Sequence, residues 1–412
     1  MPQILRLPIT NVYAKGDFTV RVLIGSDAVP LQLILDTGSS TLALHCKAYL
    51  PADDKHLRAT SLVQEVRYGI GGWAGPVTIT SMQLHGDHDL PVQHNYVALA
   101  SEGQPPLAKA DGILGLAYNR LNQATDISGY LASQQPPQAS SLPWPFEHHD
   151  VSTLDVIATA LQHFPKHNLT PWFSHIEQHG VVANLFSFYC QRSSVHYCEN
   201  SADNNSAPLQ DPLNQGWFIL GGGPEQHDLY EGEFQTIRVM HDVYYNVELT
   251  AIQVADLAPL NCPAGSGADS ANGFIDTGCS GILLPQSCYQ QLLQRLIQFN
   301  AELEPVLQQL PVFNGVEQGI ASQLVNLHQW PTLYFYFAGE NGDTVKLACP
   351  PQDYWQLNAP QYGLASFKII PQLPHFASQI IIGLPLLCNY FTVFDRAVHQ
   401  TGVIRCAKAK RG

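Results

Sequence analysis

Charged side chains are scarce in this chain of 412 residues. They make up 13% of the sequence, against roughly 25% in an ordinary globular protein. Basic residues are the scarcer sign, with 20 lysines and arginines, 34 aspartates and glutamates and a formal net charge of −14. Such a surface repels the phosphate backbone, which excludes nucleic-acid binding through a general basic face. Protonation of the 17 histidines would bring the net charge close to zero in mild acid.

Long apolar runs are also missing. A membrane helix needs about 18 uninterrupted apolar residues, and the longest candidate, 379–394, is broken by Gly383, Pro385 and Asn389. The first six residues lack the basic start, apolar segment and small-residue cleavage site of an export signal. We therefore expect no membrane association and a cytoplasmic location.

The nine cysteines include no C-x-x-C pair. Cys190 and Cys198 could close one loop, but free thiols in a reducing compartment are the favoured interpretation. The sequence also lacks the H-E-x-x-H, G-x-S-x-G and P-loop motifs of metal, serine and nucleotide chemistry. We expect neither a metal nor a cofactor.

Short strand-like runs dominate what is present. Runs rich in Val, Ile, Thr, Tyr and Phe, bounded by turn residues, predict a mainly β protein, and the length predicts two domains. The clearest runs are 18–25, 31–35, 77–84, 96–100, 186–189 and 334–338. Two helices are expected, 151–164 with Asp150 as its N-cap and 286–310 with a kink or an end at Pro305.

An internal repeat is the most informative feature. Residues 34–44, ILDTGSSTLAL, correspond to residues 274–284, FIDTGCSGILL. Each copy is later followed by two apolar residues and a glycine, at 113–115 and at 381–383. A single Asp-Thr-Gly is an ordinary turn, but two copies with matching flanks predict a tandem duplication of one β unit.

Each repeated loop carries a carboxylate directly after an apolar strand, Asp36 in the first and Asp276 in the second. Two related halves facing each other would bring these carboxylates together. Because two close carboxylates do not both ionise readily, they would share one proton. The charged member could then activate a water while the neutral member protonates a carbonyl oxygen. This is amide hydrolysis without a metal or a covalent intermediate.

These motifs resemble those of the pepsin-family aspartic proteases, in particular the bacterial homologues that lack a prosegment. The similarity covers most of the chain and also includes 111–118 (DGILGLAY), 219–222 (ILGG) and 390–397 (YFTVFDRA). It implies a mainly β, bilobal fold with lobes at 1–225 and 226–412, a cleft between them, and a monomer. The stretch from about 122 to 168 is extra, and could extend the cleft rim, dock a partner or be passive decoration.

The resemblance implies an endopeptidase that cuts proteins or peptides between apolar residues and is inhibited by pepstatin. Asp36 and Asp276 would be the catalytic pair, and Tyr68 and Gly69 would form the flap that closes over the substrate. The residues expected to support the pair are Thr37, Gly38, Ser39, Thr277, Gly278 and Cys279. One shared proton predicts an activity maximum at about pH 4 to 5. The alternative is a catalytically silent peptide-binding or inhibitory module.

Several positions depart from the family pattern. Cys279 replaces a hydroxyl residue, so the charged form of Asp276 is expected to lose support. Ala43 replaces the tryptophan that normally holds the flap tyrosine; Trp73 could take that role, although packing within the hairpin is favoured. Cys46 and Cys262 lack the nearby partners that close loops in secreted members. Asp36 also lies where a mature enzyme would place it, so control by acidity is expected instead of a prosegment.

Overall fold

The computed structural model describes residues 2–68, 71–104, 107–146, 153–201, 204, 206–265, 271–373 and 379–411. These residues form two compact units, Thr19–Val181 and a second unit that combines Pro2–Phe18 with Val182–Gly412. The mainly β class predicted from the sequence is confirmed, and the six clearest strand runs all coincide with strands, although Gly25 at the end of the run 18–25 lies in the turn after β2.

The two units differ from the predicted lobes, 1–225 and 226–412. The N-terminal strand belongs to the second unit, because its residues from Leu5 to Thr10 pair with the strand that ends at Leu220. The segment after Val181 also belongs there, because Leu185 to Phe188 pair with a strand near the C-terminus. Both assignments depend on long-range strand pairing, which a motif-based boundary does not reveal.

The first unit is built on one sheet, ordered β11-β10-β5-β6-β7-β4-β9-β3-β2, with β8 paired to β6. Its strands are β2 (Asp17–Ile24, of which the first two residues belong to the second unit), β3 (Val29–Asp36), β4 (Leu42–His45), β5 (Arg58–Arg67), β6 (Gly72–His85), β7 (Asp89–Ala100), β8 (Glu102–Gln104), β9 (Gly112–Gly115), β10 (Gln123–Asp126) and β11 (Lys166–Asn168). The end of β6 also pairs with β2, which closes part of the sheet on itself.

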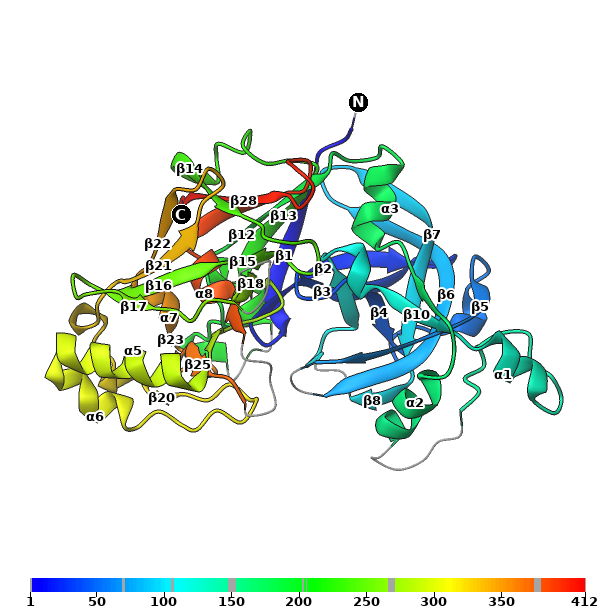
Figure 1. Cartoon of the computed structure of the whole chain (residues 1–412), viewed down its shortest axis with the longest axis horizontal. Helices are drawn as coiled ribbons and strands as arrows, with labels where there is room; N and C mark the ends of the chain where they lie inside the picture. The colour runs from blue at the N-terminus through cyan, green and yellow to red at the C-terminus, as the bar shows by residue number, and fades with distance from the viewer. Residues whose placement is uncertain are drawn as a thin grey trace. The chain divides into compact units, whose positions relative to one another are not determined.

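Three helices lie on this sheet, α1 (Ser128–Ser133), α2 (Thr153–Leu161) and α3 (Trp172–Gln178). Helix α3 packs against β7, whereas α2 lies beside β8 and the start of β6 (Figure 1). The helix predicted over 151–164 is therefore present as α2, while its proposed N-cap Asp150 and first residues lie outside the described residues.

The second unit contains four groups of strands. One has the order β1-β13-β12-β27-β28-β14, and the others are β15-β18-β26-β19-β25, β17-β16-β21-β22 and β20-β24-β23. The strands are β1 (Leu5–Ala14), β12 (Leu185–Cys190), β13 (Gln215–Leu220), β14 (Tyr230–Arg238), β15 (Asn246–Val247), β16 (Leu249–Val254), β17 (Leu260–Asn261), β18 (Gly273–Ile275), β19 (Ile282–Leu284), β20 (Ile320–Ala321), β21 (Leu333–Ala338), β22 (Thr344–Cys349), β23 (Trp355–Leu357), β24 (Leu364–Phe367), β25 (Ile369–Pro371), β26 (Ile380–Ile382), β27 (Tyr390–Asp395) and β28 (Val403–Ala409).

The helices of the second unit are α4 (Ala207–Gln210), α5 (Gln286–Phe299), α6 (Glu304–Leu307), α7 (Pro351–Tyr354) and α8 (Leu384–Leu387). The helix predicted over 286–310 is divided into α5 and α6, and Pro305 lies in the first turn of α6, where its missing N–H has no helical acceptor to lose. In the described part of the chain, no helix has the length and apolarity that crossing a bilayer requires.

The cysteines are all free thiols in the structure. The loop that Cys190 and Cys198 could have closed is not closed. The Cys190 sulfur instead lies 3.3 Å from that of Cys388, at the end of α8, and both residues are buried. Cys46 and Cys262 are likewise unbonded, as the sequence led us to expect.

Candidate active site

The first Asp-Thr-Gly loop connects β3 to β4. Strand β9 lies between them, parallel to β3 and antiparallel to β4, and Asp36 is the register partner of Gly115. Asp36 is buried, with 8% of the residue exposed, and its carboxylate accepts a hydrogen bond of 2.7 Å from the Gly38 N–H at Oδ1. The Ser39 hydroxyl donates to Oδ2, as the sequence predicted. Both carboxylate oxygens are therefore oriented by groups of the same loop.

The second loop repeats this arrangement between β18 and β19. Strand β26 lies parallel to β18 and antiparallel to β19, so the three strands have the same relations as β3, β4 and β9. The Gly278 N–H donates to Asp276 Oδ1 at 2.8 Å, which matches the first loop. The tandem repeat seen in the sequence is thus a repeat of local geometry.

A glycine packs under each loop at the end of the intervening strand. A Cβ atom on Gly115 would lie 2.4 Å from the Thr41 nitrogen, and one on Gly383 would lie 2.1 Å from the Cys279 carbonyl oxygen. Both distances are shorter than van der Waals contact, so only glycine allows the strand to approach the loop this closely. This explains why a glycine follows the two apolar residues in both halves.

Cys279 occupies the position that corresponds to Ser39, but its thiol makes a different contact. Its sulfur donates to the Gly281 carbonyl oxygen at 3.2 Å. Burial raises the pKa of the Cys279 thiol well above its usual value, and the nearby charge of Asp276 raises it further. The residue therefore stays a neutral thiol, and the two loops differ in the group that follows the glycine.

Thr37 and Thr277, two of the residues expected to support the pair, are fully buried. The family resemblance implies that each braces the other loop by a hydrogen bond. Burial is compatible with such a structural role, and the reciprocal bonds stay a prediction.

Tyr68 directly follows β5, at the end of the β5–β6 hairpin. Its N–H donates to the Gly71 carbonyl oxygen at 3.1 Å, and its hydroxyl accepts a hydrogen bond of the same length from Trp73 Nε1. Burial raises the pKa of the Tyr68 hydroxyl; the bond from Trp73 opposes this and the charge of Asp36 adds to it. The hydroxyl thus keeps its proton and lies within electrostatic range of the first carboxylate. Gly69, the other predicted flap residue, lies outside the described residues.

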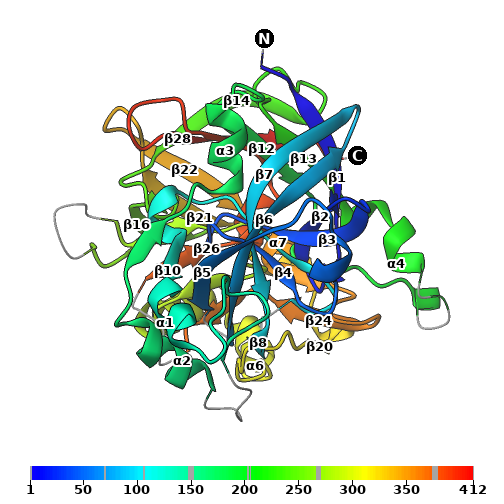
Figure 2. The same ribbon diagram turned by 90° about the vertical axis from the view of Figure 1, so that its right-hand side faces the viewer.

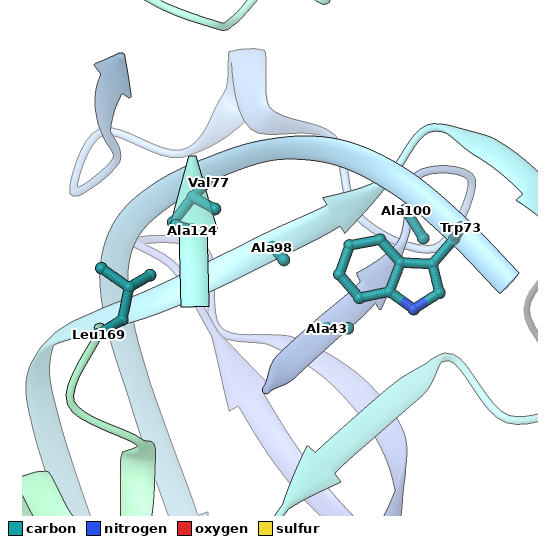
Figure 3. Packing of buried hydrophobic residues seen from close by; sticks show 7 residues of the cluster. All are labelled: Ala43, Trp73, Val77, Ala98, Ala100, Ala124 and Leu169. Atoms are coloured by element: carbon teal, nitrogen blue, oxygen red, sulfur yellow. The ribbon is translucent and has the colours of Figure 1, made fainter. Parts of the chain in front are cut away.

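Trp73 combines the two roles that the sequence left open. It is fully buried in a cluster with Ala43, Ala98 and Ala100, against which the half-buried Tyr68 packs. Figure 3 shows the Trp73 indole above Ala43, with small side chains around it. An alanine at position 43 leaves room for an indole that comes from the hairpin itself. The preference for pure packing was therefore incomplete, because Trp73 also holds the tyrosine by a hydrogen bond.

A possible metal-binding group lies elsewhere in the second unit. Among the described residues, His196, Cys198 and Asp211 place one donor atom each within 4.8 Å of one another. His196 Nδ1 lies 2.5 Å from Asp211 Oδ2, and Asn358 Nδ2 lies 3.4 Å from His196 Nε2. These contacts fit a ring that carries its proton on Nδ1 and accepts at Nε2. A metal bound at Nδ1 would displace the contact with Asp211 and require the proton to move to Nε2, so we assign no metal to this group.

Two strand-bound loops with a carboxylate each, and a tyrosine-bearing hairpin in the first unit, are the features of an aspartic protease. Comparison with known proteins agrees with this class. The model of the eukaryotic aspartyl protease family matches residues 155–406, and the chain belongs to this family.

Relatives extend the similarity beyond the matched region. Pepsin-3 of Oryctolagus cuniculus is 23% identical over 421 residues, which cover 96% of this chain and 82% of that protein. Pepsin A of Canis lupus familiaris is 22% identical and covers 98% of this chain and 84% of its own length. Cathepsin E of Aquarana catesbeiana is also 22% identical, with 97% and 82% covered. These alignments span both Asp-Thr-Gly loops, although the family model matches only the second.

Proposed function

We propose that this protein is an aspartic endopeptidase in which Asp36 and Asp276 act together on one water molecule. The observation that carries the proposal is the repeated loop geometry. In each unit an aspartate stands at the end of a buried strand or directly after it, and a third strand with a closely packed glycine lies between the two strands that flank the loop. The hydrogen bond from the glycine two residues later is an ordinary turn feature by itself. The repeat of the whole arrangement around both carboxylates is what supports a paired role for them.

The mechanism follows from a carboxylate pair that shares one proton. The charged member takes a proton from water as the water oxygen bonds to the peptide carbonyl carbon. The neutral member gives its proton to the carbonyl oxygen, which forms a tetrahedral diol. The carboxyl group that took the proton from water then gives it to the amide nitrogen, while one diol hydroxyl returns a proton to the other carboxylate. The carbon–nitrogen bond breaks, and a carboxylic acid and an amine are released as the two peptide products. Neither a metal nor a covalent enzyme intermediate is required.

Tyr68 supplies the second part of the site. We propose that its hairpin closes over the bound peptide, with the Tyr68 hydroxyl held by Trp73 and its own proton available to the substrate. Closure of this kind excludes water and orients the reacting carbonyl. Ser39 keeps Asp36 in the orientation that water activation needs.

The substrates proposed are unfolded proteins or peptides with apolar side chains on both sides of the cut. The preference is taken from the family resemblance; Phe274, directly before the second loop, is itself buried and stacks on Tyr244 with ring centroids 4.6 Å apart. Because the pair works with one shared proton, activity should be greatest at about pH 4 to 5 and weak at neutral pH. Pepstatin should inhibit it.

The test is cleavage of a denatured protein at acid pH. Asp36→Asn and Asp276→Asn should each lower the rate by about a thousandfold or more, while Asp53→Asn, an exposed aspartate of the first unit, should leave it unchanged. A catalytically silent peptide-binding module would instead bind peptides without cutting them at any pH. If Asp36→Asn and Asp276→Asn cleave the protein as fast as the wild type does, the proposal is overturned.

A further inference from the structure

We call residues 122–168 the insertion, and its described parts, 122–146 and 153–168, pack against the flap hairpin, which we define as β5, β6 and Tyr68. Two hairpin residues, Val63 of β5 and Ala74 of β6, belong to an apolar cluster that is otherwise made by the insertion. The insertion contributes buried Ile127, Leu131, Ile157 and Leu161, with Tyr130, Trp144, Phe146, Leu154 and Phe164 packed against them. Figure 2 shows β10, α1 and α2 gathered beside β5.

Backbone hydrogen bonds attach the insertion to the outer edge of the hairpin. Strand β10 pairs with β5, with Thr125 opposite Val63. Farther along, the Ser141 N–H donates to the Thr60 carbonyl oxygen at 2.7 Å, and its hydroxyl donates to the Leu62 carbonyl oxygen at 2.8 Å. The edge of β5 is therefore covered along much of its length rather than left open to solvent.

Helix α2 contacts β5, β6 and β8 near the free end of the hairpin. Leu154, Ile157 and Leu161 follow a helical spacing and point into the apolar cluster, while Val156 on the other face is 60% exposed. The Leu154 side chain also reaches Gly103 of β8, where an added Cβ atom would lie 2.9 Å from it. Strand β8 in turn pairs with the start of β6, so β8 connects α2 to the hairpin.

An ion pair joins α2 to the residue next to the flap tyrosine. Arg67 Nη1 lies 2.8 Å from Asp155 of α2, and Arg67 Nε donates to Glu65 at 2.6 Å. Arg67 is the last residue of β5 and directly precedes Tyr68. The pair is exposed and contributes little to global stability, but its position lets it limit movement at the tyrosine end.

We propose that the insertion is a brace that positions Tyr68, with Arg67 and Asp155 as positioning residues for the peptidase reaction. The inference rests on the proposed function and goes beyond it, because it assigns the extra segment a role. At the tyrosine end, the paired residues of β5 and β6 are extended by the three-residue strand β8, and so short a set of strands depends on packing for its stability. The packing of the insertion therefore determines how far this end opens. The brace therefore sets the balance between an open flap that admits substrate and a closed flap that orients it.

Two sets of variants test the brace. Ile157→Ala loosens the apolar cluster, and Ile176→Ala on α3 is its matched control, because it truncates a fully buried isoleucine that packs near β7 instead. Asp155→Asn removes the ion pair, Asp155→Glu retains its charge, and Val156→Ala controls for a change on the exposed face of α2.

Two readouts are compared for each variant, hydrogen exchange of the β5 and β6 amides and the kinetics of peptide cleavage. Ile157→Ala should speed exchange in the flap hairpin about tenfold or more and lower kcat per folded molecule about fivefold or more. Asp155→Asn should lower kcat about two- to fivefold, and Asp155→Glu should restore it. Ile176→Ala and Val156→Ala should leave both readouts for the hairpin at wild-type values.

The outcomes separate this inference from the proposed function. If the wild type cleaves peptides but Ile157→Ala and Ile176→Ala have equal exchange and equal kcat, the brace is wrong and the peptidase stands. If the wild type cleaves nothing while Ile157→Ala still speeds hairpin exchange, the proposed function is wrong and the mechanical support of the hairpin stands. An effect of Asp155→Asn that Asp155→Glu does not reverse would also overturn the role of the ion pair.

Discussion

The hydrogen bond from Trp73 to Tyr68 makes a prediction that a double-mutant cycle can measure. Trp73→Phe removes the donor and keeps an aromatic ring, while Tyr68→Phe removes the acceptor. A neutral hydrogen bond contributes about 0.5–1.5 kcal/mol net, so the coupling between the two substitutions should be about 1 kcal/mol. This energy corresponds to about fivefold in kcat/KM. The kcat/KM of the double variant should therefore be about fivefold higher than the value obtained by multiplying the two single effects.

The stability cost of Trp73→Phe should be moderate. Trp73 is fully buried above Ala43, so the shorter ring leaves part of its space unfilled. We expect the free energy of unfolding to fall by about 1–2 kcal/mol, less than the roughly 3–5 kcal/mol of a tryptophan-to-alanine change. Kinetics should therefore be measured at a temperature where every variant is folded, which circular dichroism can verify.

The assay is steady-state cleavage of one fluorogenic peptide at acid pH by the wild type, both single variants and the double variant. Tyr96→Phe is the matched control, because Tyr96 packs against the same cluster. The cycle between Trp73→Phe and Tyr96→Phe should be additive. Additive effects for Trp73→Phe and Tyr68→Phe as well would refute the idea that Trp73 holds the flap tyrosine through this bond.

Three further predictions concern pH. Cys279→Thr offers a hydroxyl to Asp276 and should shift the acid limb of activity to lower pH; an unmoved limb would count against it. Burial raises the pKa of Asp353 from 3.8 to about 6 although Arg411 opposes this, so the folded state binds the proton more tightly. Protonation of Asp353 therefore contributes about 3 kcal/mol to the free energy of unfolding below about pH 4, and this contribution is lost as the pH rises through about 6. Urea unfolding of wild type and Asp353→Asn from pH 4 to 7 should show this difference, and parallel profiles would contradict it. Burial acts against ionisation of Asp54, but hydrogen bonds to its carboxylate, the largest from Thr80, lower its pKa below the usual value. The ionised carboxylate therefore stabilises the folded protein at neutral pH, and this stabilisation is lost in acid. Thr80→Val should cost about 1–3 kcal/mol at pH 7 and less at pH 3, as thermal unfolding can test; an equal cost at both would show the linkage wrong.

Much of the site was predictable because its determinants are local. A strand, a carboxylate, a glycine and a small polar residue occur within a few positions of one another, and the same order occurs near Asp36 and near Asp276. The hydrogen bond from Ser39 to Asp36 was implied by the family resemblance, whereas the bond from the Gly38 N–H was not predicted. The catalytic role of the pair, the cytoplasmic location and the monomeric state stay predictions.

Other features could not be predicted because they depend on packing between distant segments. The sequence named Trp73 as a candidate to hold Tyr68 but favoured packing within the hairpin, and only the approach of the two side chains in the structure shows the hydrogen bond. Arg67 and Asp155 are far apart in the sequence, and an acidic residue in the first turn of a helix is common enough to give no signal. The contact between Cys190 and Cys388 likewise joins residues that sequence spacing would not pair.

By itself, the sequence determined the duplicated β unit, the two carboxylate loops and the glycines beneath them, because strand, turn and close approach are encoded within short stretches. The tertiary structure decided to which unit the N-terminal strand belongs, which side chain donates a hydrogen bond to Tyr68 and against which strands the insertion packs. Those outcomes depend on complementary volumes and strand edges that meet only after folding, such as the small side chain of Ala43 and the indole of Trp73.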